Sequence, residues 1–206
     1  PALYDYQRLV RSCRIDAPPG WAGLDDYLHD LAASLHARHD LLQAHPPTQS
    51  ARTGTQVELR PGSPSADRAV RAFPAAVDGA IRRYMETVMA TGADAFSRRG
   101  TGRYRFSGIW SVRLKSQGHH TSHFHGKGWI SSACHIQVPA SLSGDDRGGW
   151  LKFGHELSSG APPGHCVKPV PGLLTLFPSW MWHGTVPFAA APGDYRLSVA
   201  FDVVPD

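Results

Sequence analysis

The sequence predicts an α+β fold that is mainly β, in which N-terminal helices pack on a barrel or sandwich of short strands. Two patterns along the chain predict this fold. The first hundred residues contain apolar residues at helical spacing. After Gly100 the chain consists of short apolar or alternating runs separated by Gly, Pro and Asp, which is typical of an all-β unit. Because strands and helices do not alternate, a parallel doubly wound sheet is not expected.

Two helices are expected in the first half. The first has an apolar stripe at steps of three, four and seven residues, formed by Leu24, Leu28, Leu31, Leu35 and Leu42. Asp25 and Asp26 fall in its first turn, where the helix dipole favours acidic side chains. The second helix, expected to begin near Pro74, has one apolar face formed by Val77, Ile81, Tyr84 and Val88. The segment 45–56 between them is rich in turn-forming residues and predicts a loop.

Five strands are expected in the second half, at about residues 104–115, 129–138, 150–154, 172–177 and 195–204. Trp110, Trp129 and Trp150 occupy strand positions, and we expect them to pack in the core. A chain of 206 residues is long enough for one full hydrophobic core and hardly for two. We therefore expect a single domain over 1–206, with a helical layer over 1–100 and a β core over 101–206.

Composition and charge exclude several classes of protein. Hydrophobic residues make up 41% and charged residues 18% of the chain, and no apolar run is long enough for a membrane span. The net charge of +4 comes from small, scattered groups of basic residues, so no nucleic-acid partner is expected. The three cysteines are widely and irregularly spaced, which predicts neither a disulfide framework nor a zinc finger. This cysteine usage favours a reducing, cytoplasmic setting.

Histidines are concentrated in one segment between two expected strands, where five of the twelve fall within seventeen positions. In extended backbone, side chains two residues apart point the same way, so His123 and His125 can bind one metal while Phe124 faces away. A third ligand is expected from a distant strand, and His183, shortly after the apolar run 173–177, is the candidate. Three protein ligands on one face leave positions for a bidentate co-substrate and O2, as in non-haem Fe(II) oxygenases.

A possible anchor for such a co-substrate follows His183 by thirteen positions. Arg196 and Ser198 project to the same side of an expected strand, while Leu197 and Val199 point to the other side. The arginine fork matches a carboxylate, and the serine hydroxyl adds a further donor. A dicarboxylate held there by its far end would reach the metal with its oxo-acid end.

The order of these motifs resembles the 2-oxoglutarate and Fe(II)-dependent oxygenase superfamily. The motifs are His-x-His, then Gly-Leu-Leu-Thr-Leu-Phe-Pro-Ser-Trp-x-x-His, then Arg-x-Ser-x-Ala-Phe. Within the superfamily, the chain is similar to a group of bacterial oxygenases, some of which carry the domain behind tetratricopeptide repeats. The similarity covers about residues 104–205 well and extends weakly to 49–56. It implies a double-stranded β-helix, that is, a jelly-roll or cupin-like barrel.

The resemblance also implies roles for single residues. The superfamily holds its metal with a histidine, a carboxylate two positions on and a distal histidine, and an Arg or Lys follows for the oxo-acid. His123 and His183 are then ligands of Fe(II), and Arg196, assisted by Ser198, anchors 2-oxoglutarate. His125 stands where the superfamily has the carboxylate. A three-histidine face makes the site one charge more positive, which alters the redox tuning of the metal.

Four residues, His123, His125, His183 and Arg196, thus form the predicted active site. Arg113 is also expected to contact the co-substrate, and Gln49, Arg52 and Gln56 are weaker candidates for binding substrate or closing over the mouth. Two alternatives for the set of metal ligands stay open. In one, His120 replaces His123 or His125; in the other, Glu156 is a further ligand.

The function implied is oxidation, by default hydroxylation, of a C–H bond in a small-molecule or peptidyl substrate, with O2 and 2-oxoglutarate consumed. One alternative is a three-histidine, cupin-like dioxygenase that needs no oxo-acid. Another is a β-barrel module that only binds metal; structural zinc sites usually include thiolates, and no cysteine lies beside the histidine pair. The sequence determines neither the substrate nor the oligomeric state.

Overall fold

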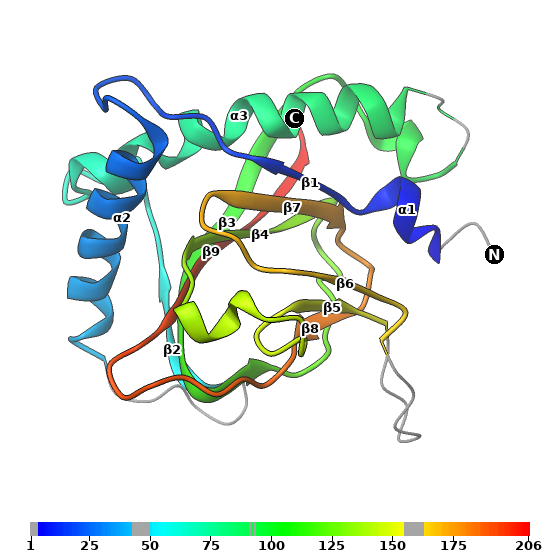
Figure 1. The fold of residues 1–206 in the computed structure, drawn as a ribbon. Helices are drawn as coiled ribbons and strands as arrows, with labels where there is room; N and C mark the ends of the chain where they lie inside the picture. Colours follow the sequence, from blue (N-terminus) through cyan, green and yellow to red (C-terminus); the bar gives the residue numbers. More distant parts are fainter. Residues whose placement is uncertain (1–3, 43–49, 91, 93, 155–162) are drawn as a thin grey trace.

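The computed structural model describes residues 4–42, 50–90, 92, 94–154 and 163–206 (Figure 1). In these residues the chain forms two antiparallel sheets, one with the strand order β1-β7-β4-β9-β3-β2 and one with the order β6-β5-β8. The strands are β1 (Arg11–Arg14), β2 (Ala51–Glu58), β3 (Tyr104–His120), β4 (Ile130–Gln137), β5 (Leu151–Phe153), β6 (His165–Val167), β7 (Leu173–Pro178), β8 (His183–Thr185) and β9 (Arg196–Pro205). The α-helices are α1 (Tyr6–Leu9), α2 (Leu24–His39) and α3 (Arg68–Met89), and the 3-10 turns are Ser97–Arg99 and Ala140–Ser143.

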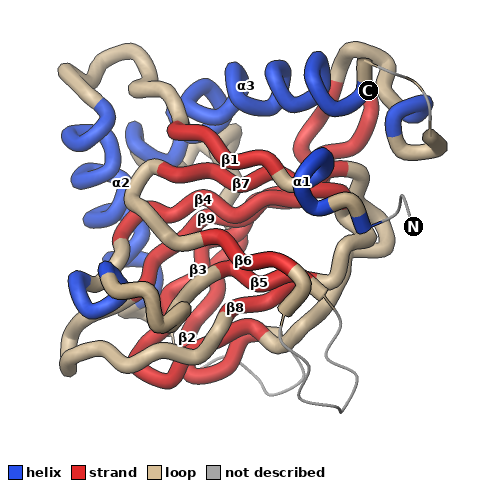
Figure 2. The backbone as a smooth tube through the Cα atoms, turned by 45° about the vertical axis from the view of Figure 1, so that its right-hand side comes forward, coloured by secondary structure: helices blue, strands red, loops and turns tan. Residues whose placement is uncertain are grey.

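The two sheets enclose a cavity. Helices α2 and α3 lie against the larger sheet on its other side (Figures 1 and 2). This arrangement is a double-stranded β-helix with helices packed on one sheet, as the sequence predicts. The small sheet forms the opposite wall of the cavity.

Strand β9 separates the helix-facing core from the cavity. Side chains alternate along a strand, so every second residue points to one face. The residues that pack under the helices are Leu197, Val199, Phe201 and Val203. The residues that line the cavity are Arg196, Ser198, Ala200 and Asp202. The alternation predicted for residues 196–199 is confirmed and continues to residue 203.

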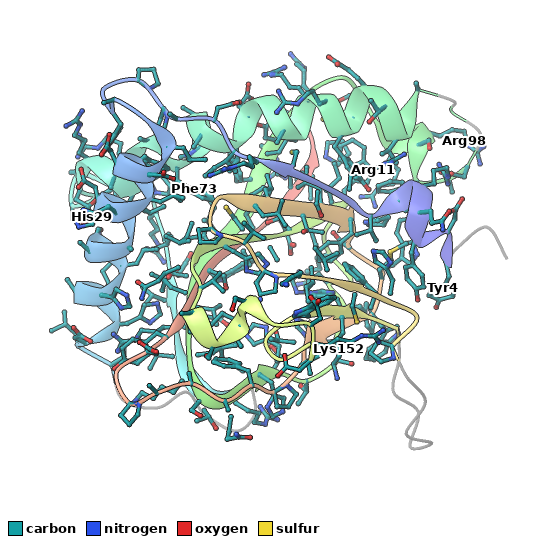
Figure 3. All side chains as sticks on the ribbon, in the orientation of Figure 1. Tyr4, Arg11, His29, Phe73, Arg98 and Lys152 are labelled. Atoms are coloured by element: carbon teal, nitrogen blue, oxygen red, sulfur yellow. The ribbon has the colours of Figure 1, made fainter. Side chains whose placement is uncertain are left out.

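The helix-facing core is apolar. The face of α3 predicted from the sequence, Val77, Ile81, Tyr84 and Val88, is buried. Phe73 of the same helix packs edge-on against Phe201 of β9, with ring centroids 6.1 Å apart. Figure 3 shows side chains filling the space between α3 and the sheet, where Phe73 lies. Burying such large side chains stabilises the fold by roughly 1.5–3 kcal/mol each.

The first helix ends earlier than its leucine stripe predicts. Leu28, Leu31 and Leu35 are buried in α2, but Leu42 lies beyond the helix and is exposed. The end is set by His39, whose Nδ1 contacts Thr55 Oγ1 at 2.8 Å and whose Nε2 contacts Ser111 Oγ at 2.9 Å. These contacts attach the last turn of α2 to the large sheet, and the chain leaves the helix there.

The second helix begins earlier than predicted. It starts at Arg68, after Asp67, whose side chain accepts a hydrogen bond from the backbone N–H of Val70. This N-cap sets the start of the helix. Pro74 therefore lies in the second turn instead of near the first residue. The expected start at Pro74 was wrong because a side-chain cap upstream outweighed the preference of proline for the first turn.

The division into a helical layer over 1–100 and a β core over 101–206 needs correction. Strands β1 and β2 come from the first hundred residues and form the two edges of the larger sheet. Residues 51–56, predicted as loop, belong to β2. Edge strands have one sheet neighbour and often a polar face, so their apolar alternation is weak. The three-residue strands β6 and β8 are too short to produce a pattern.

None of the described helices has a stretch that is both long and apolar enough to cross a lipid bilayer. The three cysteines, Cys13, Cys134 and Cys166, are free thiols. Trp129 is fully buried in the core, as expected.

Candidate metal and co-substrate site

The cavity between the sheets has a volume of about 320 Å³, at the lower end of the range usual for small-molecule sites. Strands β2, β3, β4, β5, β8 and β9 all contribute to its lining. The apolar part of the lining comprises Trp110, Val112, Ala133, Leu151 and Ala200. Trp110 thus faces the cavity, which corrects its expected place in the core. Such a site can hold a small polar ligand together with part of a larger one.

Three imidazoles meet on one side of this cavity. His123, His125 and His183 each offer a ring nitrogen, and these three atoms all lie within 4.8 Å of one another. Backbone hydrogen bonds fix their positions: His123 and His183 exchange two N–H···O=C bonds of 2.9 Å, and the N–H of His125 donates to Ser179 O at 2.8 Å. The structure therefore brings His183 to the His123–His125 pair, although His183 follows His123 by sixty positions in the sequence.

The Nδ1 atoms of these rings are occupied by acceptors of the protein. His123 Nδ1 lies 2.8 Å from Thr121 O, and His183 Nδ1 lies 2.9 Å from Met181 O. His125 Nδ1 lies 2.8 Å from both carboxylate oxygens of Asp202. A ring whose Nδ1–H is donated in this way keeps its Nε2 lone pair for a metal.

Burial favours the neutral form of two of the three rings, His123 and His183. Burial lowers the pKa of His123, and it lowers that of His183 well below the usual value, with further lowering from neighbouring histidines. Neutral imidazoles are the form that binds metal. Three imidazole nitrogens within 4.8 Å of one another are suited to Fe(II) or another borderline divalent ion, and they form one face of a coordination sphere.

Arg196 lies in the same cavity and is fully buried. Its Nε donates to Gly149 O at 3.0 Å, and it forms no ion pair with a carboxylate among the described residues. Burial lowers the pKa of Arg196 to about 10, so the guanidinium remains charged at neutral pH. A buried charge without a counterion is unfavourable, which predicts an anionic ligand at this end of the cavity. The hydroxyl-bearing residues Ser198 and Thr185 also line it.

Two further imidazoles near Arg196 have buried nitrogens without a hydrogen-bond partner among the described residues: Nε2 of His120 and both ring nitrogens of His135. His120 lines the cavity, and His135 is fully buried beside Ser198 on the neighbouring strand. Burial lowers the pKa of both rings well below the usual value, and the charge of Arg196 lowers each further. Buried polar groups without partners are rare and indicate a ligand or water at that place.

Arg113 does not face the cavity. It points from the opposite face of β3, where its Nη1 donates to Asp40 Oδ1 at 2.6 Å and its guanidinium stacks on Tyr195 at 4.6 Å. The expected contact with the co-substrate is therefore wrong. The reason is strand alternation: Val112 points into the cavity, so its neighbour Arg113 must point toward α2.

The structure places the weaker candidates for substrate binding differently. Gln56 lines the cavity with Ser50, whereas Arg52 is not among the lining residues and its Nη1 donates to Ala51 O at 3.1 Å. Gln49 and Glu156 lie outside the described residues. Asp202 is the residue that the sequence argument missed. The alternation that selects Arg196 and Ser198 also selects Asp202, four positions further along β9.

The fold and the histidine cluster define the class of protein. Residues 108–202 match the family model described as "Putative 2OG-Fe(II) oxygenase". Residues 108–202 are therefore similar to 2OG-Fe(II) oxygenase domains, a class of oxidoreductases whose cofactors are Fe(II) and 2-oxoglutarate. O2 and an organic substrate are the partners of this class. The link to tetratricopeptide repeats stays a prediction.

Solved structures support the same fold. The chain is similar to a prolyl-4-hydroxylase of Pseudomonas putida, at 18% identity and a TM-score of 0.61, over 98% of this chain and 96% of that one. It is similar to a viral collagen prolyl hydroxylase from Paramecium Bursaria Chlorella virus-1 in its 2OG complex, at 10% identity, a TM-score of 0.60 and 96% and 97% coverage. It also resembles HygX of Streptomyces hygroscopicus with nickel and 2-oxoglutarate bound, at 12% identity, a TM-score of 0.53 and 98% and 85% coverage. A comparison with curated protein sequences gave no match.

Proposed function

We propose that this enzyme hydroxylates a C–H bond of a small-molecule or peptidyl substrate, with His123, His125 and His183 holding Fe(II) and Arg196 holding 2-oxoglutarate. One observation supports this most strongly. A single cavity contains three imidazole donors within 4.8 Å of one another and a buried guanidinium without a carboxylate partner among the described residues. A metal face and an anion site in one cavity are what a chelating dicarboxylate requires.

The protein residues divide the binding of 2-oxoglutarate between them. Arg196 and Ser198 lie side by side on β9 and offer charged and neutral donors to the distal carboxylate. His120 lines the cavity with an unpartnered Nε2, and both His123 and Arg196 act on its pKa. We therefore place His120 beside the bound co-substrate, between the metal face and the arginine, as a hydrogen-bond donor.

When bound, Fe(II) and 2-oxoglutarate supply, with O2, the oxidising power for the attack on the C–H bond. The remaining contributions come from the protein. The backbone pairing of His123 with His183 keeps the metal face rigid, and the apolar walls formed by Val112, Leu151 and Ala133 exclude bulk water. Trp110 and Gln56, which line the cavity and are half-buried, offer an aromatic surface and an amide to the substrate.

The test is conversion of 2-oxoglutarate to succinate by the purified protein. Without its substrate, an enzyme of this kind is expected to turn over slowly, with a rate that requires added Fe(II) and O2. His183→Ala is expected to lower this rate at least a hundredfold, because it removes one of three metal ligands. Succinate formation that does not depend on Fe(II), or that survives in His183→Ala, would overturn the proposal.

His119→Ala is the matched control. His119 belongs to the same histidine-rich segment, but its Nδ1 contacts Gln117 O at 3.2 Å and it lies outside the metal cluster. This variant is expected to keep the wild-type requirement for Fe(II) and a similar rate. Equal losses in His119→Ala and His183→Ala would mean that the whole segment, and not the three-residue face, carries the effect.

A further inference from the structure

A buried carboxylate lies directly behind one of the three histidines. Both carboxylate oxygens of Asp202 are 2.8 Å from His125 Nδ1, and Ser131 Oγ donates to Asp202 Oδ1 at 2.6 Å. Only 9% of the Asp202 side chain is exposed. The carboxylate is therefore held in place by two partners, one of which is a proposed metal ligand.

The other two histidines have neutral acceptors at the same place. His123 Nδ1 faces the backbone carbonyl of Thr121, and His183 Nδ1 faces that of Met181. A charged acceptor draws the Nδ1 proton more strongly than a carbonyl does, which makes the opposite Nε2 a better electron donor. His125 is thus the ligand with the greatest negative character.

Asp202 itself lacks an ordinary counterion. Among the described residues its ion pair is with His125, and none is formed with a lysine or arginine. A carboxylate this deeply buried is unfavourable unless a cation compensates it. A divalent ion on the far side of the His125 ring would provide that charge, and this observation points to a cation independently of the three Nε2 atoms.

The chain leaves little room around this contact. A Cβ atom at Gly128 would collide with Ser179 Oγ and lie 3.4 Å from Asp202 Cγ. Ser179 Oγ in turn lies 2.9 Å from Ser131 Oγ. The packing of this small polar group therefore restricts Asp202 to the position behind His125.

We propose that Asp202 supplies, through His125, the negative charge that a carboxylate ligand provides in the superfamily pattern. The inference rests on the proposed function, because it needs a metal on the three histidines. Asp202 is then a positioning residue: it orients His125, fixes its tautomer and offsets the extra positive charge of a three-histidine face. The His125–Asp202 pair acts as one anionic ligand.

The first test compares Asp202→Asn with wild type in two measurements that need no substrate. Affinity for Co(II), titrated against a chromophoric chelator, is expected to fall about tenfold or more. The Fe(III)/Fe(II) midpoint potential is expected to rise, because a lost negative charge favours the reduced metal. Asp202→Glu, which keeps the charge, is expected to keep the potential close to that of wild type. Equal shifts of the potential in Asp202→Asn and Asp202→Glu would overturn the inference, because Asp202 would then act only through its packing.

Ser179→Ala is the control within the same polar group, since it removes a hydroxyl and no charge. It is expected to change Co(II) affinity less than threefold. If Asp202→Asn behaves like Ser179→Ala while His183→Ala abolishes Co(II) binding, only the role of Asp202 fails. If His183→Ala binds Co(II) as wild type does, the proposed function fails with it.

A second comparison, made in the variant His125→Asp, tests the same inference without depending on how well Asp202→Asn alone folds. His125→Asp places a carboxylate at the ligand position itself, beside Asp202. In this background Asp202→Asn is expected to leave Co(II) affinity unchanged or to raise it, because one carboxylate suffices and two repel each other. A loss of affinity as large as that in the wild-type background would contradict the inference.

Discussion

Arg196 contributes a buried, fork-shaped cation to the cavity, and the shape of this side chain can be tested apart from its charge. Arg196→Lys keeps the charge but loses the bidentate geometry and the hydrogen bond to Gly149 O. We expect the KM for 2-oxoglutarate to rise at least tenfold in succinate-formation assays. Arg11→Lys, an exposed exchange on β1 (Figure 3), serves as the control and should leave KM unchanged. An unchanged KM in Arg196→Lys would place the carboxylate elsewhere.

His120 offers a second test at the scale of single residues. His120→Phe keeps an aromatic ring in the cavity and removes the Nε2 donor, which has no partner in the protein residues described. Hydrogen bonds to charged groups contribute about 1.5–3 kcal/mol, so binding of 2-oxoglutarate should weaken by roughly tenfold or more. Calorimetric titration with Mn(II) in place of iron measures this. Affinity equal to that of wild type would mean that His120 faces another ligand or water.

Much of the candidate site is predictable from the sequence because residues two apart in a strand share a face. That rule gives His123 with His125, and Arg196 with Ser198. It does not reveal which face of β3 meets the cavity, and Arg113 was assigned to the wrong side for this reason. The burial of His135 and of the His120 Nε2 atom depends on pairing between strands that are distant in sequence, which local spacing does not encode.

At the scale of elements, Asp67 joins the start of α3 to α2. Its carboxylate accepts hydrogen bonds from Val70 N at the helix start and from Ser34 and Arg38 of α2. Burial raises the pKa of Asp67, but these hydrogen bonds outweigh burial and lower the pKa to about 2. Because the folded-state pKa is depressed, the stabilisation is present above about pH 4 and is lost as the pH falls toward 2.

Asp67→Ala is therefore expected to lower the free energy of unfolding by about 1–2 kcal/mol at pH 7, which is the usual effect of losing an N-cap. An ordinary surface substitution has a smaller effect. Urea denaturation followed by circular dichroism measures the change. Asp67→Ser, which keeps a capping oxygen, should recover part of the loss. A change within 0.5 kcal/mol, roughly the effect of an ordinary surface substitution, would show that the cap does not hold the helix start.

The elements predicted best were those with long apolar patterns. The faces of α2 and α3 and the alternation of β9 follow directly from the spacing of leucines, valines and phenylalanines. The edge strands β1 and β2 were missed because most of their stabilisation comes from pairing with β7 and β3, partners distant in sequence. The start of α3 depended on the hydrogen bond from Val70 N to Asp67, which outweighed the signal from Pro74.

At the scale of the whole molecule, a buried histidine links the helical layer to the β-helix and makes stability depend on pH. Burial lowers the pKa of His39 from 6.5 to about 4, with further lowering from Arg113 and His36. Since the folded-state pKa of this base is depressed, its neutral form is compatible with folding above pH 6.5. Stability is lost as the pH falls from about 6.5 to about 4, because the unfolded chain binds the proton first.

Protonation of His39 is expected to lower the free energy of unfolding by on the order of 1–2 kcal/mol between pH 7 and pH 5. His39→Gln should be less stable at pH 7, because it loses one of two hydrogen bonds, and it should lose less further stability between the two pH values. Denaturation midpoints at pH 7 and pH 5 test this. His29→Gln, an exposed exchange on the same helix (Figure 3), is the control and should keep the wild-type difference in stability between pH 7 and pH 5. If His39→Gln also keeps that wild-type difference, the role assigned to His39 is contradicted.

The central claim is that one cavity holds Fe(II) on three histidines and 2-oxoglutarate on Arg196. The most direct measurement is the weak visible absorption band that arises when the oxo-acid chelates Fe(II), recorded under anaerobic conditions. The band is expected in the wild-type protein and in His119→Ala. It is expected to be absent in His183→Ala and to need much higher 2-oxoglutarate concentrations in Arg196→Lys. Iron binding without the band at saturating 2-oxoglutarate would contradict the claim.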